Sequence, residues 1–209
     1  MIYPIMSNSS GSNCYIVAGK KIALIDAGVD PNEILKKIGD LNIGIDVLIN
    51  THCHYDHIAG NLEIKKRTNA KIAAHELDAM PIEDDNSEFT LAGLFYDKLP
   101  KIKVDIKLED NQIIDLGSLK LEVIHTPGHT LGSICIYEKK SKSLFSGDTI
   151  FNGGIGRTDL PNGNHEKLKK SIERLIELNR KHGVDIIYPG HGEFEKGKNL
   201  EKIYKMYFG

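Results

Sequence analysis

The chain has 209 residues, of which 40% are hydrophobic and 27% are charged. This composition is typical of a folded globular protein, and it excludes a disordered, collagen-like or membrane-spanning chain. The 27 Lys and Arg residues nearly balance 29 Asp and Glu residues, so the formal net charge of -2 creates no field that would hold a nucleic acid.

The first half of the chain predicts short strands that alternate with helices. Apolar runs bounded by Gly, Asp or Asn predict strands over 14–18, 22–25 and 47–49. Between the last two strands, Pro31 and the apolar spacing after it predict a helix over 31–38 that stops at Gly39. A helix over 57–66 and a strand over 71–74 come next. The polar stretch over 80–99 is interpreted as an irregular rim or lid.

The second half predicts a second group of strands followed by helices. The predicted strands are 112–116, 119–124, 133–137, 143–145 and 185–188. The predicted helices are 166–179 and 199–207. Two strand-rich blocks interleaved with helices indicate two β-sheets packed together with helices outside. No linker or repeat interrupts the chain, so we expect one domain over residues 1–209.

The cysteines and the N-terminal residues indicate the cellular compartment. Cys14, Cys53 and Cys135 are widely spaced and form no Cys-x-x-Cys pair, which argues against a disulfide framework and favours a reducing compartment. The N-terminal segment has no basic region of a signal peptide, and no apolar run approaches the roughly 20 residues of a membrane helix. We expect a cytoplasmic protein with no membrane partner.

A dense set of potential metal ligands follows the strand predicted over 47–49. The segment from His52 to His57 contains three imidazoles and a carboxylate. In an extended exit from a strand, residues two apart point the same way, so His52 and His54 can bind one metal ion together. Asp56 and His57 then turn away and can reach a second ion nearby.

Three other predicted strands also end in potential ligands beside glycine. These ends are His125-Thr-Pro-Gly-His129, Gly147-Asp148 and Pro189-Gly-His191-Gly192. Clefts at the carboxyl ends of strands are common sites in folds of sheets and helices, and glycine allows close approach there. We therefore expect the four strand ends to converge on one site. Asp26 ends the strand over 22–25 and is the expected acceptor that orients a ligand imidazole.

The four motifs together resemble the metallo-β-lactamase-fold hydrolases over almost the whole chain. The motifs are His-x-His-x-Asp-His, His-Thr-Pro-Gly-His-Thr, Ser-Gly-Asp-Thr and Pro-Gly-His-Gly. The resemblance implies an α+β fold, a four-layer α/β/β/α sandwich of two mixed β-sheets with helices on the outer faces. Residues 156–161, Gly-Arg-Thr-Asp-Leu-Pro, look most like the type II glyoxalase (hydroxyacylglutathione hydrolase) branch, although they are also similar to persulfide dioxygenases.

The resemblance also implies a ligand set for two divalent metal ions. It assigns His52, His54 and His129 to the first ion and Asp56, His57 and His191 to the second, with Asp148 bridging them. Asp56 and Asp148 are also the expected catalytic residues. Zinc is the expected metal, with iron or manganese as alternatives, because His and Asp ligands suit all three. Two such ions, two carboxylates and one hydroxide leave one positive charge to attract a carbonyl oxygen or an anionic substrate.

The predicted activity is hydrolysis of a small thioester or ester, such as a hydroxyacyl-thiol, by a water that the two ions activate. The longer type II glyoxalases carry a C-terminal helical domain that grips glutathione, and about one helix follows His191 here. We therefore expect no such domain, and a different thiol carrier remains open. A persulfide dioxygenase with one iron at His52, His129 and Asp148 is the alternative, followed by lactone or phosphodiester hydrolysis. We expect a monomer or small homo-oligomer without nucleic acid.

Several further residues have a simpler structural explanation. We expect Cys53 to point away from its neighbouring ligands and to pack in the core. Arg157 and Asp159 are expected to form an ion pair that holds their loop, with a substrate anion as the alternative partner of Arg157. The remaining histidines are expected to be structural: His75, His125, His165 and His182. The apolar residues over 89–96 are interpreted as a wall of the site or as part of the core.

Overall fold

The structure is a computed structural model that describes residues 1–7, 11–28, 30–84, 86–95 and 99–209. The strands of the first sheet are β1 (Ile2–Ile5), β2 (Cys14–Ala18), β3 (Ile22–Ile25), β4 (Val47–Ile49), β5 (Lys71–His75) and β6 (Ile106–Leu108). The strands of the second sheet are β7 (Ile113–Asp115), β8 (Lys120–His125), β9 (Ile134–Glu138), β10 (Ser143–Gly147), β13 (Ile186–Pro189) and β14 (Glu195–Lys196). A small hairpin consists of β11 (Ile150–Phe151) and β12 (Gly154–Ile155).

Six α-helices and two 3-10 helices join these strands within the described residues. The α-helices are α1 (Pro31–Leu41), α2 (Tyr55–Ile58), α3 (Asn61–Thr68), α4 (Glu76–Glu83), α5 (His165–His182) and α6 (Leu200–Phe208). The 3-10 helices are η1 (Ala92–Phe95) and η2 (Gly197–Asn199).

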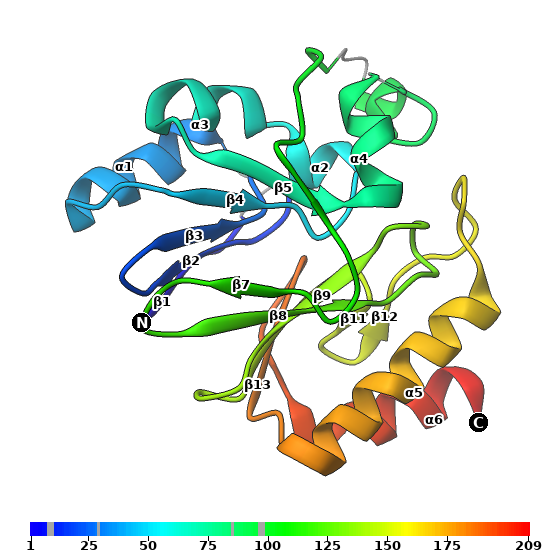
Figure 1. Ribbon diagram of the computed structural model, residues 1–209. Helices are drawn as coiled ribbons and strands as arrows, with labels where there is room; N and C mark the ends of the chain where they lie inside the picture. Colours follow the sequence, from blue (N-terminus) through cyan, green and yellow to red (C-terminus); the bar gives the residue numbers. More distant parts are fainter. Residues whose placement is uncertain (8–10, 29, 85, 96–98) are drawn as a thin grey trace.

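Both main sheets are mixed. In the first sheet the order is β1-β2-β3-β4-β5-β6, with β1, β2 and β3 antiparallel and β3 to β6 parallel. In the second sheet the order is β14-β13-β10-β9-β8-β7, in which β10 and β13 are parallel and the other pairs antiparallel. Figure 1 shows the two sheets face to face, with α1 and α3 outside the first and α5 and α6 outside the second.

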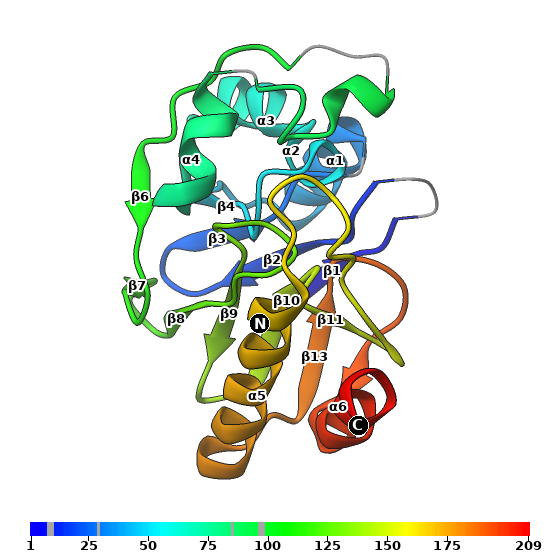
Figure 2. The ribbon, with the colours of Figure 1, turned by 90° about the vertical axis from the view of Figure 1, so that its right-hand side faces the viewer.

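Successive side chains of a strand point to opposite faces of its sheet and so build three layers of hydrophobic core. One layer lies between the two sheets, and one lies between each sheet and its helices. On β9, Ile134 and Ile136 pack into the cluster between the sheets, whereas Cys135 and Tyr137 pack toward α5 and α6. This period of two is the geometry that buries both faces of a strand. The turned view in Figure 2 places α5 and α6 together on the outer side of β13. The predicted four-layer α/β/β/α sandwich is therefore confirmed.

The predicted helix boundaries were wrong at two places in the first half of the chain. The first helix does not stop at Gly39; it continues to Leu41, and Asn42 ends it in the left-handed conformation with φ 51°. The helix predicted over 57–66 is two helices, α2 and α3, separated at Gly60. The backbone N–H of Gly60 donates to the carbonyl of Ala27 (2.9 Å), and a β-carbon there would lie 2.6 Å from that oxygen. The bend thus lets the chain after β3 approach closely.

The polar stretch over 80–99 is more ordered than predicted. It begins inside α4, whose N-cap His75 accepts a hydrogen bond from the N–H of Leu77 (3.3 Å), and it contains η1. The sequence did not predict α4 because Pro81 lies within it and its apolar residues have no clear helical stripe. Residues 85 and 96–98, including Tyr96 of the predicted wall, lie outside the described residues.

Candidate metal centre

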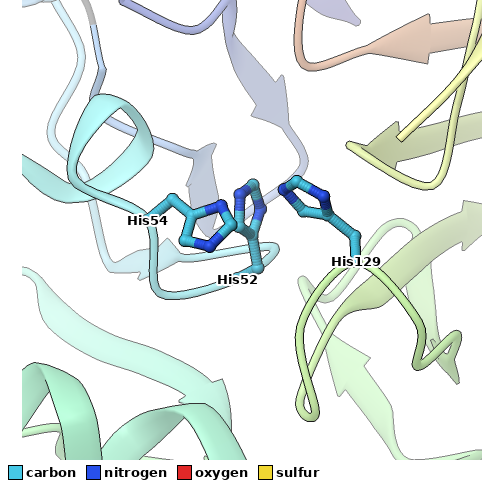
Figure 3. A group of neighbouring side chains, drawn as sticks. All are labelled: His52, His54 and His129. Atoms are coloured by element: carbon cyan, nitrogen blue, oxygen red, sulfur yellow. The ribbon is translucent and has the colours of Figure 1, made fainter. Parts of the chain in front are cut away.

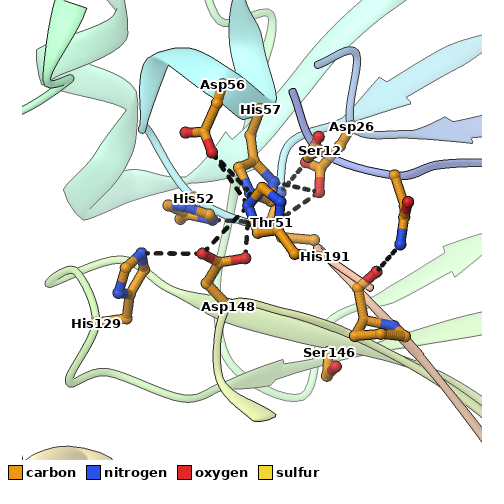
Figure 4. A network of polar contacts seen from close by, with 12 residues as sticks. Ser12, Asp26, Thr51, His52, Asp56, His57, His129, Ser146, Asp148 and His191 are labelled. Carbon is orange, nitrogen blue, oxygen red and sulfur yellow. Dashed lines mark hydrogen bonds and ion pairs between the residues drawn. The ribbon is translucent and has the colours of Figure 1, made fainter. Parts of the chain in front are cut away.

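Loops at the carboxyl ends of β3, β4, β8, β10 and β13 meet at one edge of the sandwich. These loops bring seven His and Asp side chains together, of which Figure 3 labels His54 and Figure 4 the others. The residues are His52, His54, Asp56, His57, His129, Asp148 and His191. The expected convergence of four strand ends is therefore observed, and the end of β3 joins it through Asp26.

His52, His54 and His129 form a first cluster from two separate loops. Figure 3 shows the three rings turned toward one another. One nitrogen from each ring lies within 4.8 Å of those of the other two, and all three side chains are buried. The three Nε2 atoms have no hydrogen-bond partner among the described residues. An unpaired buried nitrogen is costly unless a cation accepts its lone pair. These orphaned atoms therefore fit a divalent metal ion.

Asp56, His57 and His191 form a second cluster beside the first. The Nε2 atom of His191 lies 3.1 Å from Oδ2 of Asp56 and 3.3 Å from Nε2 of His57. The three ligand atoms of this second cluster lie within 4.8 Å of one another, as those of the first cluster do. A carboxylate and two imidazoles at this spacing match the donors that divalent transition metals take.

Asp148 lies between the two clusters. Its Oδ1 is 3.2 Å from Nε2 of His57, and its Oδ2 is 3.5 Å from Nε2 of His129 and 3.6 Å from Nε2 of His191. A carboxylate oxygen of Asp148 also lies within 4.8 Å of the ligand nitrogens of His52 and His57, so the carboxylate faces two members of each cluster. A single residue in this position can contact a cation on either side.

Burial and local charge set opposite protonation states in the centre. Burial, followed by the nearby imidazoles, lowers the pKa of His52 far below its usual value, and burial lowers the pKa of His54 to about 3. Although burial alone would raise it, the charge of His57 holds the pKa of Asp148 below its usual range. Although burial lowers it, the charges of Asp26 and Asp148 raise the pKa of His57 well above its usual value, so this imidazole would release a proton when a metal ion binds.

Asp26 accepts a hydrogen bond from the candidate ligand His57, which is the contact that the sequence predicts. Oδ2 of Asp26 accepts a hydrogen bond from Nδ1 of His57 (2.8 Å) and another from the hydroxyl of Thr51 (2.8 Å). With Nδ1 carrying the proton, Nε2 of His57 presents its lone pair to the centre. Asp26 holds the left-handed conformation with φ 58°, which is uncommon outside glycine and is frequent at functional sites.

Thr51 and the carbonyl of Arg157 likewise accept hydrogen bonds that orient the imidazoles of His52 and His129. The Thr51 hydroxyl donates to Asp26, so its oxygen accepts from Nδ1 of His52 (3.2 Å). The backbone oxygen of Arg157 accepts from Nδ1 of His129 (2.8 Å). Both contacts leave Nε2 free to bind a cation. Neither contact is evident from the sequence, because a hydroxyl and a carbonyl have no motif of their own.

Two glycines allow the loops to approach. A β-carbon at Gly190 would overlap Oδ1 of Asp148 and lie 2.7 Å from Cε1 of His57. A β-carbon at Gly147, which has φ 47°, would lie 2.6 Å from Cβ of Thr51. Glycine is therefore required for the exits of β10 and β13 to reach the segment after β4.

The sequence also missed a buried carboxylate that joins the two loops of the first cluster. Asp78 of α4 accepts hydrogen bonds from the N–H groups of Cys53 (2.9 Å) and Gly132 (2.6 Å) and from the hydroxyl of Thr130 (2.7 Å). Burial raises the pKa of Asp78. No sequence signal distinguishes it from an exposed helical acid, because its partners lie 25 to 54 residues away.

The other residues take the structural roles that the sequence predicts. Cys53 is 2% exposed and packs with apolar side chains around α4. His75 and His125 stack on each other, with ring centroids 4.0 Å apart, and belong to neither cluster of the described residues. Arg157 forms a two-point ion pair with Asp159, at 3.0 and 2.9 Å. His165 contacts the ring of Phe208, and His182 closes α5.

A cavity of about 370 Å³ opens onto the metal centre. Its lining combines members of both clusters with apolar side chains of the rim. This volume is within the range of small-molecule sites in proteins. The predicted wall of the site is thus observed over Leu91, Leu94 and Phe95, and Leu94 is 69% exposed rather than part of the core.

Residues 8–191 match the sequence model of a family that is described as "Metallo-beta-lactamase superfamily". A probable metallo-hydrolase of Methanocaldococcus jannaschii is 39% identical over 197 residues, covering 92% of this chain and 93% of its own. The hydroxyacylglutathione hydrolase GloC of Haemophilus influenzae is 33% identical over 190 residues, covering 87% and 86%.

Solved structures show the same fold. BLEG-1, described as a B3 metallo-beta-lactamase, superposes with a TM-score of 0.88 at 26% identity and covers 100% of both chains. TTHA1623, solved in a di-iron-bound form, has a TM-score of 0.82 at 27% identity, and the match covers 96% of each chain.

No helix within the described residues combines the length and apolar character needed to cross a bilayer.

Proposed function

Because the chain belongs to the metallo-beta-lactamase superfamily and is a metallohydrolase of that fold, we propose that it hydrolyses thioesters at a centre of two divalent metal ions. The observation that carries this proposal is the division of the ligands into two triads with Asp148 between them. One metal ion would need only one such triad, whereas two triads joined by a carboxylate suit two ions.

Each residue has a defined part in the proposal. His52, His54 and His129 would hold the first ion, and Asp56, His57 and His191 the second, with Asp148 contacting both. Two bound ions would polarise a substrate carbonyl and lower the pKa of a water to near neutrality. Asp26 keeps the proton on Nδ1 of His57, and Thr51 and the Arg157 carbonyl do the same for His52 and His129. The imidazoles are therefore oriented before the ions bind.

Two observations favour a thioester over other carbonyl substrates. Every titratable side chain in the described lining of the cavity, apart from Arg157, belongs to the two triads or to Asp148, which leaves no separate general acid. A thiolate leaves without protonation at neutral pH, so it needs none. In addition, one relative at 33% identity carries the name hydroxyacylglutathione hydrolase. We propose zinc as the native metal, with iron and manganese as the alternatives.

Metal content and hydrolysis test this proposal together. Protein purified without chelator or added metal should contain close to two metal ions per chain, and it should hydrolyse members of a thioester panel. Chelation should abolish the activity, and zinc should restore it. Asp148→Ala should lose at least about 100-fold in kcat while the protein stays folded. Unchanged hydrolysis by Asp148→Ala would reject the mechanism. A single iron with oxygen consumption would instead indicate a dioxygenase.

A further inference from the structure

The cavity beside the metal centre has an apolar wall made by two segments that are distant in sequence. One side comes from the residues just before and within η1, and the other comes from the β11–β12 hairpin and the loop after it. The apolar residues that line it are Leu91, Leu94, Phe95, Phe151, Ile155 and Leu160. Leu94 and Phe95 are 69% and 40% exposed. Burial of their side chains against an apolar ligand would therefore be favourable.

Contacts to Tyr55 hold this wall in place. The ring of Phe95 stacks on that of Tyr55, with centroids 4.7 Å apart, and Tyr55 directly follows the proposed ligand His54. The backbone N–H of Tyr55 also donates to the carbonyl of Thr90 (2.6 Å). Leu91 holds a left-handed conformation with φ 59°, which is uncommon for a bulky side chain and is enriched at ligand sites.

Outside the candidate metal centre, the described lining of the cavity offers no unpaired cation for a substrate carboxylate. Among the described lining residues, Arg157 is the one charged side chain outside the two triads and Asp148. Its guanidinium is already paired at two points with Asp159. A carrier such as glutathione brings two carboxylates, which would need cations for recognition. The lining instead offers apolar surface next to the atoms where a carbonyl would be cleaved.

We propose that the wall binds the uncharged, apolar acyl group of a short- to medium-chain thioester whose carbonyl lies at the metal centre. This inference rests on the proposed hydrolase function and specifies its substrate class. The cavity of about 370 Å³ limits the chain length, because methylenes beyond its capacity stay in water. Each methylene that is buried should improve kcat/KM about fourfold.

A series of thioesters of one neutral thiol tests the proposal. Acetyl, butanoyl, hexanoyl and octanoyl thioesters should show kcat/KM values that rise with chain length and then level off. A hexanoyl-length acyl group that ends in a carboxylate should be at least tenfold worse than hexanoyl. Calorimetry with hydrolysis-inert thioether analogues should show Kd falling along the same series with a negative heat-capacity change.

Variants of two exposed leucines assign the effect to the wall. Leu94→Lys should lower kcat/KM for the hexanoyl thioester about five- to tenfold and improve it for the carboxylate-ended analogue. Leu77→Lys is the matched control, because Leu77 is 47% exposed and lies outside the cavity lining. It should change neither value more than twofold. Both sites are on the surface, so both proteins should fold.

The outcomes separate this inference from the proposed function. A flat chain-length profile, or preference for the carboxylate-ended substrate, overturns the inference while hydrolysis itself stands. Chain-length-dependent binding of inert analogues without hydrolysis of any thioester supports the apolar subsite and rejects the proposed function. Neither binding nor hydrolysis along the series rejects both.

Discussion

The hydroxyl of Thr130 donates a hydrogen bond of 2.7 Å to Oδ2 of Asp78. Thr130 follows the proposed ligand His129, and the same carboxylate oxygen accepts from the N–H of Cys53, which lies between His52 and His54. One buried side chain of α4 therefore links the two loops that supply the first cluster. It sets their separation without contacting the metal centre itself.

Replacing this carboxylate should weaken metal binding at the first cluster. Asp78→Asn keeps the size of the side chain but turns an amide NH₂ toward N–H donors, which leaves buried polar groups unpaired. We expect the free energy of unfolding to fall by about 1–3 kcal/mol. The affinity for the first ion should fall about 10- to 100-fold. Titration with cobalt(II), followed by absorption, measures the two binding steps.

The matched control for this variant is Asp84→Asn, at the exposed C-terminal end of α4. It should leave both metal steps and the unfolding free energy unchanged. Equal losses at both metal steps in Asp78→Asn would contradict a role limited to the first cluster, because the second cluster has no contact with Asp78.

Asp26 should matter most for the second cluster. In Asp26→Asn the amide can no longer accept hydrogen bonds at both former oxygens, so the proton on Nδ1 of His57 loses its fixed acceptor. Asn tolerates the positive φ of this position, so the backbone should be retained. We expect metal affinity at the second cluster to fall about 10- to 100-fold.

Metal content after dialysis against a weak chelator measures this loss. Asp40→Asn on the exposed face of α1 is the control and should retain the wild-type metal content. Full retention of metal by Asp26→Asn would show that His57 is oriented without the carboxylate.

Two glycine variants should have opposite effects on stability. Gly190→Ala places a β-carbon against Oδ1 of Asp148 and Cε1 of His57, so the loop after β13 must move. We expect a lower unfolding temperature and loss of metal. Gly39→Ala has open space around its β-carbon within α1 and should stabilise the protein by about 0.5–1 kcal/mol. Thermal unfolding with metal analysis checks both, and a wild-type metal content in Gly190→Ala would refute the close approach.

The stacked pair of His75 and His125 should contribute to loss of stability in acid. Burial, followed by the charge of His125, lowers the pKa of His75 to about 4 from its usual 6.5. The folded state therefore favours the neutral ring, and the unfolded chain takes up a proton first as the pH falls. This stabilisation is fully present above pH 6.5 and is lost between pH 6.5 and 4.

Urea unfolding of His75→Asn at pH 7 and pH 5 tests this contribution. Asn is a good N-cap, so α4 should still begin correctly. The variant should lose less stability than the wild type between the two pH values. His165→Asn, at an exposed position of α5, controls for the loss of one imidazole. Identical losses in His75→Asn and the wild type would remove His75 as a source of the acid sensitivity.

Local patterns were sufficient for most of the fold. Runs such as Ile22–Ile25 predict strands because every residue is apolar. In the structure this strand lies inside the first sheet, and its side chains are buried on both faces of that sheet. Edge and short strands such as β1, β6 and β14 were missed, since a few residues with partial burial carry little pattern. The division between α2 and α3 was missed because the bend depends on Ala27, which packs against Gly60 from another part of the chain.

The sequence by itself determined which side chains reach the centre, because all seven ligand candidates follow apolar runs that end at the same edge of the sandwich. Only the tertiary structure decided how they are held. Thr51, Asp78 and the carbonyl of Arg157 fix ligands through contacts between distant loops, and local patterns carry no record of such contacts. The apolar cavity likewise depends on how η1 and the β11–β12 hairpin lie across the metal centre, because its surface belongs to neither segment alone.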